Sequence, residues 1–431
     1  MKLSSILGLN SRSAIFGNNS ARSKRIARSK ILTKRILRRA GVPTPKLYKV
    51  FRTDRDISNF DWGKISSSFA LKPSKSSYGD GIIIVRKRVD VENKLTPSYW
   101  VTSQRKKIYK EDLDLHVLDI LEGAYSVGNV PDIAFCEEYI ARHKVFRRFA
   151  YRGTPDIRVL VFNSVPVMSM LRLPTVESGG RANLHKGAIG VGIDIETGVT
   201  TYAIHHGERI EYKPGNSKVK FSGIKIPSWS QILEVAVSGA AAAGLDLCGV
   251  DVVLHSERGP QVLELNSQPG LQIQLANMAG LRKRLERVED LRVLDAEHGV
   301  RIAKALFSSH AKRKSEDTHV LGIAEKIKIR TANGAKRVVE AKVDTGAHRS
   351  AIDKKLAREL GLLKARNILW KRKVRSTFGE EERPVISLVF WLRGKKIVTQ
   401  AGVADRKNMK KRVIIGRRDL GGFLVELGRK K

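Results

Sequence analysis

Two short apolar segments carry polar side chains where a buried strand normally has only hydrophobic ones. Residues 249–254 (GVDVVL) hold Asp251 in mid-run, and residues 261–266 (QVLELN) hold Glu264 and Asn266. Because side chains two residues apart on a strand share a face, Glu264 and Asn266 point the same way. Two carboxylates and an amide oxygen suit Mg²⁺ or Mn²⁺. The pattern predicts a strand pair that holds a divalent metal; the alternative is a buried polar cluster with satisfied hydrogen bonds.

The sequence around this pair predicts a mixture of helices and strands. Residues 30–41 (KILTKRILRRAG) have apolar side chains at helical spacing and end in a glycine stop signal. Further helices are expected at 111–124, 230–243 and 295–307, and strands at 69–72, 82–85, 133–140, 157–163 and 166–171. We therefore predict one α+β domain over residues 1–307, which is long enough to bury its own core.

A lysine and a glycine loop add a second signal to the metal ligands. Lys72 ends a predicted strand, and the loop that follows contains Gly79 and Gly81. A lysine there can neutralise phosphate charge, and glycine lets the backbone approach a phosphate closely. The segment Glu137-Glu138-Tyr139-Ile140 has the character of an adenine hinge, in which an exposed strand edge offers backbone donors and acceptors. Each feature is weak alone, but all of them fit one nucleotide site.

These motifs resemble the ATP-grasp superfamily, and within it the RimK-type α-L-glutamate ligase branch, over residues 5 to 300. The resemblance is densest along residues 153–194, which include PDIR, MLRL and RANLHKG, and it extends to LELNSQPG. Residues 6–12 (ILGLNSR) resemble the opening of the subgroup called α-L-glutamate ligase-like, so we do not interpret the basic N-terminus as a transit peptide. Classical members carry a larger N-terminal domain, and Leu173 stands where they usually have a second arginine. Both departures leave acceptor recognition open.

The resemblance assigns expected roles residue by residue. Lys30 and Lys72 match the two nucleotide-contacting lysines of the family. Four further positions match phosphate or acyl-phosphate contacts: Arg158, Arg172, Arg181 and Asn183. His185 and Lys186 lie beside the expected reaction centre, where His185 fits a structural hydrogen bond as well as a catalytic role.

The implied chemistry is an ATP- and Mg²⁺-dependent carboxylate–amine ligation. ATP phosphorylates a carboxylate, an amine attacks the acyl phosphate, and an amide forms with release of ADP and phosphate. Such a reaction needs positioning and charge stabilisation rather than a covalent nucleophile on the protein. The resemblance implies an amino acid donor such as glutamate and an acceptor carboxylate on a peptide, a protein tail or a metabolite. A cell-wall or cofactor amide is an alternative product.

A second domain is expected after a polar linker at residues 308–319. Residues 320–431 are rich in strand-like runs, at 326–330, 338–343, 384–393 and 413–415, with one helix near 353–360. The motif Asp344-Thr345-Gly346-Ala347 and the later VIIGRRDLGGF resemble a retropepsin-like aspartic peptidase, and more closely the RimB or "ATP-dependent zinc protease" family. Since the chain has one such aspartate motif, the resemblance implies a homodimer if Asp344 is catalytic. A module that only dimerises the ligase or binds its peptide is the alternative.

The charge of the chain permits a different function. Lys and Arg total 81 against 43 Asp and Glu, and no acid occurs before residue 54. Such an excess attracts polyanions, so an RNA- or ribosome-binding protein with a secondary ATP site is the alternative to a ligase. Two isolated cysteines, Cys136 and Cys248, provide no disulfide framework, and no apolar run is long enough for a membrane span. We expect a cytoplasmic protein without a membrane partner.

Overall fold

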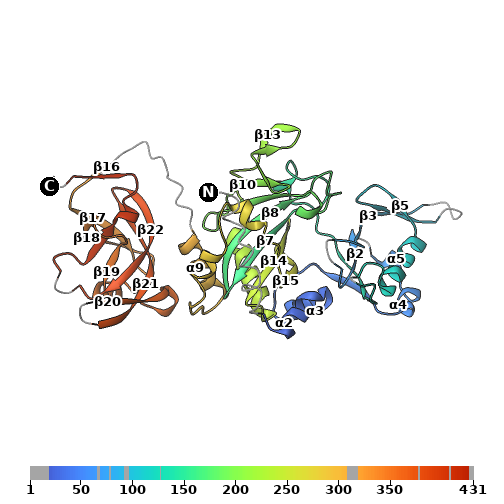
Figure 1. The fold of residues 1–431 in the computed structure, drawn as a ribbon, viewed down its shortest axis with the longest axis horizontal. Coiled ribbons are helices and arrows are strands. Elements are labelled where there is room, and N and C mark those ends of the chain that lie inside the picture. The colour runs from blue at the N-terminus through green and yellow to red at the C-terminus, as the bar shows by residue number, and fades with distance from the viewer. Residues whose placement is uncertain are drawn as a thin grey trace. The chain divides into compact units, whose positions relative to one another are not determined.

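A computed structural model describes residues 19–426 except 66–67, 77–78, 92–96, 127, 308–318, 377–378 and 407–408. The chain forms two compact units, which meet in sequence at Val300 and Arg301, inside helix α9 (Ala296–Phe307) (Figure 1). Of the segment predicted as a linker, residues 308–318 lie outside the described residues, and His319 begins strand β16. The ILGLNSR segment also lies outside them. No helix among the described residues is long and apolar enough to cross a membrane.

The first unit contains a six-stranded sheet with its own hydrophobic core. Its strand order is β1 (Leu47–Phe51), β6 (Ala134–Glu138), β2 (Phe69–Pro73), β3 (Ile83–Val89), β4 (Tyr99–Thr102) and β5 (Lys107–Ile108). Helix α5 (Lys110–Glu122) buries Leu113, Val117 and Ile120, which are spaced for one helical face. The helix ends at Gly123, whose φ of 94° is a backbone conformation that glycine adopts without steric cost.

A larger, seven-stranded antiparallel sheet carries most of the polar residues named above. Its order is β11 (Glu208–Ile210), β10 (Thr200–His205), β9 (Ile189–Ile193), β8 (Val165–Leu173), β7 (Asp156–Phe162), β14 (Leu247–His255) and β15 (Gly259–Asn266). Helices α2 (Ala21–Arg28), α3 (Lys30–Arg39) and α6 (Trp229–Ala242) contact β15. Gly239 of α6 lies beside Leu37 of α3 and Leu265 of β15, where a Cβ would make ordinary van der Waals contact at 3.5 and 3.7 Å.

Smaller elements complete the first unit. They are α4 (Asp54–Ser58), α7 (Ile273–Asn277), α8 (Arg282–Leu285) and the strand pair β12 (Tyr212–Lys213) and β13 (Asn216–Lys220). Strand β8 contains Pro166, which cannot donate a backbone hydrogen bond. The register between β7 and β8 shifts between Leu160 and Val161, next to the position opposite Pro166, where a proline is tolerated.

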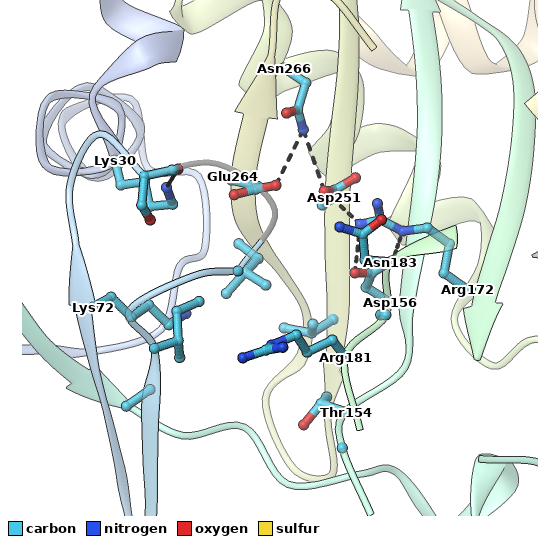
Figure 2. Close-up of a pocket in the computed structure, with 18 of the residues that line it drawn as sticks. Lys30, Lys72, Thr154, Asp156, Arg172, Arg181, Asn183, Asp251, Glu264 and Asn266 are labelled. Carbon is cyan, nitrogen blue, oxygen red and sulfur yellow. Dashed lines mark hydrogen bonds and ion pairs between the residues drawn. The ribbon is translucent and has the colours of Figure 1, made fainter. Parts of the chain in front are cut away.

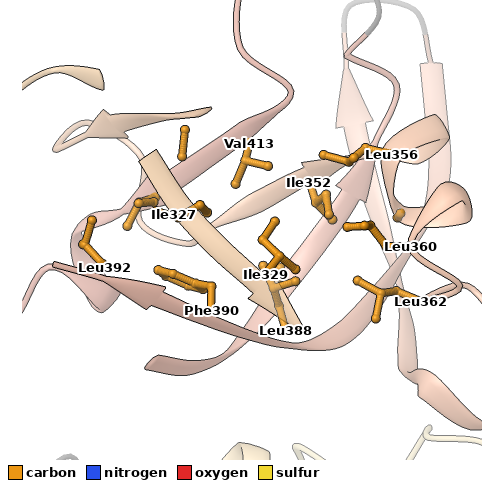
Figure 3. Packing of buried hydrophobic residues seen from close by; sticks show 14 of the residues in the cluster. Ile327, Ile329, Ile352, Leu356, Leu360, Leu362, Leu388, Phe390, Leu392 and Val413 are labelled. Atoms are coloured by element: carbon orange, nitrogen blue, oxygen red, sulfur yellow. The ribbon is translucent and has the colours of Figure 1, made fainter. Parts of the chain in front are cut away.

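The second unit is an all-β domain whose main sheet closes into a barrel. The strand order is β17 (Ala324–Arg330), β18 (Lys336–Asp344), β23 (Val413–Gly416), β19 (Ala351–Asp353), β22 (Lys395–Ala404), β21 (Gly379–Leu392) and β20 (Ile368–Ser376). An additional β17–β21 pairing closes the ring. Strand β16 (His319–Leu321) pairs with β24 (Phe423–Val425), and helix α10 (Lys354–Glu359) adds Leu356 to the core. Figure 3 shows Ile327, Ile352 and Phe390 packed inside this ring.

The elements predicted from the sequence are present with small shifts at their ends. Residues 166–171 are part of a longer strand, β8, and residues 384–393 are part of β21, which is paired from Gly379 onward. In the first unit no strand was predicted at 47–51, 99–108 or 189–220, where the structure has β1, β4, β5 and β9 to β13. Most of these strands have at most six residues and mix polar with apolar side chains, so neither alternation nor an apolar run distinguishes them. Strand β9 (IGVGI) is a buried apolar run, but its two glycines weaken the strand signal.

Candidate active site

A cavity of about 1180 Å³ lies within the first unit and is lined by residues of both sheets. Figure 2 shows Lys30 and Lys72 on one side and Asp251, Glu264 and Asn266 on the other. The predicted residues that line it are Lys30, Lys72, Gly79, Glu137, Glu138, Tyr139, Ile140, Arg158, Arg172, Arg181, Asn183, Asp251, Glu264 and Asn266. The structure therefore brings together residues that are up to 236 positions apart in sequence.

The register of three neighbouring strands places the charged residues next to one another. Arg158 of β7 lies opposite Asp251 of β14, and Asp251 lies opposite Glu264 of β15. Two residues before Arg158 on β7, Asp156 lies opposite Arg172 of β8. Since residues directly opposite each other on antiparallel strands share a face, these five side chains form one polar patch. The patch faces the cavity, which all five line.

The three predicted metal ligands converge. The Asn266 side-chain nitrogen lies 3.3 Å from Asp251 Oδ2 and 3.5 Å from Glu264 Oε1. Asp251 and Glu264 also lie directly opposite each other on β14 and β15. Adjacent carboxylates repel unless a cation or proton lies between them. In the structure the Asn266 amide nitrogen faces the two carboxylates; with the amide turned so that Oδ1 faces them, the three residues give an all-oxygen set that fits Mg²⁺.

Arginines already neutralise part of this set. Arg158 Nε and Nη2 donate to the two oxygens of Asp251 at 2.7 and 2.8 Å, and Arg172 Nη2 donates to Asp251 Oδ2 at 2.7 Å. Arg172 also makes a two-pronged pair with Asp156, at 2.5 and 2.6 Å. Burial disfavours the charge on Asp251, but the attraction of Arg158 and Arg172 outweighs it and holds the pKa of this carboxyl below its ordinary value.

A lysine group forms the opposite wall of the cavity. Lys72 Nζ lies 2.5 Å from Glu137 Oε1, Lys34 forms an ion pair with the other oxygen of Glu137, and Lys30 Nζ donates to the Ser76 carbonyl at 2.7 Å. Burial lowers the pKa of Lys30 and Lys34, and the charge of Lys72 adds to the effect. Lys34 was missed by the sequence reasoning. Its signal is its spacing, one helical turn after Lys30 on the same face of α3.

The adenine hinge differs from the prediction in one respect. The prediction places residues 137–140 at an exposed strand edge, because no strand was predicted at 47–51. In the structure, β6 lies between β1 and β2 and is therefore not an edge strand. The N–H groups of Glu138 and Tyr139 donate to the carbonyls of Lys46 and Ser68. The Ile140 carbonyl accepts from Thr154 Oγ1 at 2.7 Å. A purine contact would therefore have to use other backbone groups at the end of β6.

Two loops approach each other over the cavity. A Cβ on Gly79 would lie 3.5 Å from the Arg181 side chain, so the glycine loop and the RANLHKG loop are neighbours there. Asn183 Oδ1 accepts from the His185 N–H at 2.9 Å and caps a short 3₁₀ turn, Leu184–Lys186. His185 also lines the cavity.

Two predicted residues lie elsewhere. Gly81 is not among the lining residues; its carbonyl lies 2.8 Å from His116 Nε2, and a Cβ there would lie 2.5 Å from the Tyr125 ring. The glycine is therefore required by its φ of 72° and by the Tyr125 ring, which follows α5 in the chain. Asp344 belongs to the second unit.

A cavity with lysines on one wall and carboxylate and amide side chains on the other is suited to a nucleoside triphosphate with its metal. Residues 11–290 match the family described as sugar-transfer associated ATP-grasp, and the chain belongs to this family. The match covers the first unit and ends before α9.

Similar proteins include two described as probable α-L-glutamate ligases. The protein of Aeromonas salmonicida is 29% identical over 169 residues, which are 36% of this chain and 44% of the relative. That of Psychromonas ingrahamii is 35% identical over 133 residues, 30% of this chain and 32% of the relative. The chain thus spans less than half the length of these relatives. An L-amino acid ligase from Bacillus licheniformis matches 61% of this chain and 46% of its own, with 12% identity and a TM-score of 0.33.

Proposed function

We propose that this chain is an ATP- and Mg²⁺-dependent carboxylate–amine ligase that forms an amide through an acyl phosphate. The observation that carries the proposal is the shared cavity of Lys30, Lys72, Asp251, Glu264 and Asn266. ATP-grasp enzymes in general use ATP and Mg²⁺. The similarity to glutamate ligases supports ATP-dependent amide formation as the reaction class.

Each wall of the cavity has a task in this reaction. Lys30 and Lys72 would hold the phosphates of ATP, and residues at the end of β6 would contact adenine. Mg²⁺, held by oxygens of Asp251, Glu264 and Asn266, would neutralise charge on the transferred phosphate. Arg158, Arg172, Arg181 and Asn183 would orient the acyl phosphate. Fixed donors aimed at developing charge inside a partly enclosed site stabilise the transition state more than water does.

The substrates are proposed from the comparisons with similar proteins. Glutamate is the first donor to test because of the similarity to probable α-L-glutamate ligases. A peptide, a protein tail or a metabolite is the proposed acceptor, and because the family is described as sugar-transfer associated, we include a sugar that carries a carboxylate among the metabolites to test. We place the protein in the cytoplasm, where the buried free thiols of Cys136 and Cys248 stay reduced.

For the second unit we propose a retropepsin-like module. Asp344 ends β18 and its Oδ1 accepts from the N–H groups of Gly346 and Ala347 at 3.1 and 3.2 Å, a compact turn. Lys342 lies 3.1 Å from Asp344 Oδ2, and its hydrogen bond lowers the pKa of this carboxyl. A peptidase dyad needs one protonated and one ionised carboxyl. Since the chain has one Asp-Thr-Gly motif, peptidase activity would require a homodimer. Two roles of the module then have to be distinguished: trimming of the ligase product and dimerisation of the ligase.

The test of the ligase is ADP release with Mg²⁺ and ATP across amino acids, acidic peptides and a uronic acid, with mass spectrometry of the products. Glu264→Gln should abolish turnover that depends on one donor and one acceptor, whereas Glu257→Gln, an exposed residue in the same β14–β15 hairpin, should not. ATP binding without turnover on any pair, together with tight RNA binding, would favour the RNA- or ribosome-binding alternative.

The two roles of the second unit are separated by Asp344→Asn. If the module trims the product, the variant should leave longer chains of added residues at an unchanged rate of ADP release. Product of unchanged length would contradict trimming. Sedimentation of the same variant would then show whether the module forms dimers.

A further inference from the structure

A second group of metal-ligating side chains lies outside the lining of the cavity. Glu177, His205 and His206 each offer one ligand atom, and these atoms lie within 4.8 Å of one another. Glu177 belongs to the loop between β8 and β9, His205 ends β10, and His206 follows in the turn to β11. The proposed ligase chemistry uses none of the three.

The turn explains how two neighbours in sequence point to the same place. His205 pairs with Glu208, so His206 and Gly207 form a two-residue hairpin turn. Their φ angles are 51° and 82°, and positive values at both positions are what a type I′ turn requires. Consecutive residues of a continuous strand would point to opposite faces. The left-handed backbone at His206 instead brings its ring centroid to 4.1 Å from that of His205.

The ligand atoms have the separations that one shared cation needs. His206 Nε2 lies 2.9 Å from Glu177 Oε2, and His205 Nε2 lies 3.5 Å from the same oxygen. The Gly187 carbonyl oxygen lies 3.1 Å from His205 Nε2. Ligands that bind zinc at about 2.0–2.1 Å lie about 3.3–3.4 Å apart in a tetrahedron. Small side-chain rotations would therefore suffice to place a cation between these atoms.

We propose that Glu177, His205 and His206 form a binding site for a borderline divalent transition metal of the zinc type. Two imidazole nitrogens and one carboxylate favour such a metal over Mg²⁺, which prefers oxygen ligands. The Gly187 carbonyl is placed to be a fourth donor. Glu177 and His206 are each 54% exposed, so water has access to the fourth position when the carbonyl does not occupy it.

The site would tie a cavity loop to the neighbouring hairpin. Glu177 and Gly187 lie at opposite ends of the loop that presents Arg181 and Asn183 to the cavity. Thr175 Oγ1 already donates to the Gly187 carbonyl at 2.7 Å. A cation shared by Glu177 and the two histidines would add a link between this loop and the β10–β11 hairpin. The proposed metal site stands without the ligase reaction, because its evidence is the geometry of these three residues.

The test is zinc binding by the full chain after treatment with a chelator. Zn²⁺ is titrated against a chromogenic zinc indicator in excess Mg²⁺, which occupies oxygen-ligand sites. We expect one saturable equivalent that is lost in Glu177→Gln and in His206→Asn, since asparagine tolerates the left-handed backbone and keeps the turn. His319→Gln, an exposed histidine of β16, should bind zinc like the unmodified chain.

Hydrogen exchange provides a readout that does not depend on stoichiometry. Zinc should slow amide exchange across residues 176–186 in the unmodified chain and leave both variants unchanged. Zinc binding that is undiminished in His206→Asn would overturn the proposal. Absence of binding by the unmodified chain below about 100 μM zinc would also overturn it, because three preformed ligands should reach that affinity.

Discussion

Glu137 holds two lysines inside the protein, and its neutralisation is the sharpest test of the cavity electrostatics. The Glu137 side chain is 1% exposed, and its partners Lys34 and Lys72 are 5% and 12% exposed. Glu137→Gln keeps the shape but leaves two buried ammonium groups without a carboxylate. Removing one partner of a buried ion pair costs about 3–5 kcal/mol in unfolding free energy. For a unit of this size we expect the melting temperature to fall by about 10 °C.

The pH dependence of this loss identifies its cause. Burial already holds the pKa of Lys34 below 10.5, against the attraction of Glu137. Without Glu137 the pKa of folded Lys34 falls further, while that of the unfolded chain does not change. A lysine whose pKa is lower in the folded state costs stability at low pH, and the cost declines as pH rises toward the unfolded value. The deficit of Glu137→Gln should therefore shrink between about pH 7 and pH 10.

Urea unfolding followed by tryptophan fluorescence measures the effect, because Trp62 and Trp100 lie in the core of the same sheet. Glu122→Gln, an exposed change at the end of α5, is the matched control. Adding Lys34→Met to Glu137→Gln should restore part of the stability, since one buried charge is then removed. A deficit under about 1 kcal/mol, or no recovery in the double variant, would refute the assignment of a buried ion-pair cluster.

Three further changes test other parts of the unit. Arg172→Lys should cost about 2–4 kcal/mol in thermal unfolding, since an ammonium cannot reproduce the forked pairs with two carboxylates; full stability would contradict this. Burial lowers the pKa of His116 in the folded state, so the unfolded chain binds this proton more readily and the stability should decline as pH falls below about 6.5. In His116→Gln the melting temperature should depend less on pH in this range, which a melting series across pH measures. A Cβ on Gly153 would lie 1.7 Å from the Gly180 carbonyl oxygen, so Gly153→Ala should displace the RANLHKG loop and lower turnover about 10–100-fold. Gly280→Ala is the control and should leave turnover unchanged, because a Cβ there meets open space.

The sequence was most informative where a residue broke a strong pattern. Asp251, Glu264 and Asn266 interrupt apolar strands, and the structure places them side by side on β14 and β15. Their partners could not be predicted in the same way. Which residue of β7 lies opposite Asp251 depends on strand register, and register is set by the packing of the whole sheet. The sequence alone therefore indicated Arg158 only through family resemblance.

The other misses have physical reasons. Strand β1 has intermediate burial over four of its five residues, so it lacks the apolar signal of a central strand, and β6 was consequently placed at an edge. Lys34 resembles any basic residue of a cationic helix until the burial of its face is known. The Glu177 cluster joins a loop and a turn 28 residues apart, and only the folded hairpin shows that their atoms meet.

Strand β20 bears on how two copies of this chain can associate. It lies at the end of the sheet order, and β21 pairs with it along one side. Lys371, Arg372 and Lys373 are consecutive exposed cations on this strand. An unpaired strand edge is a template for another chain, and adjacent like charges discourage that contact. Lys371 is paired with Glu382 of β21, and the cations along β20 make a continuous sheet across many copies of the chain unfavourable, so we expect β20 not to be the strand that joins two copies.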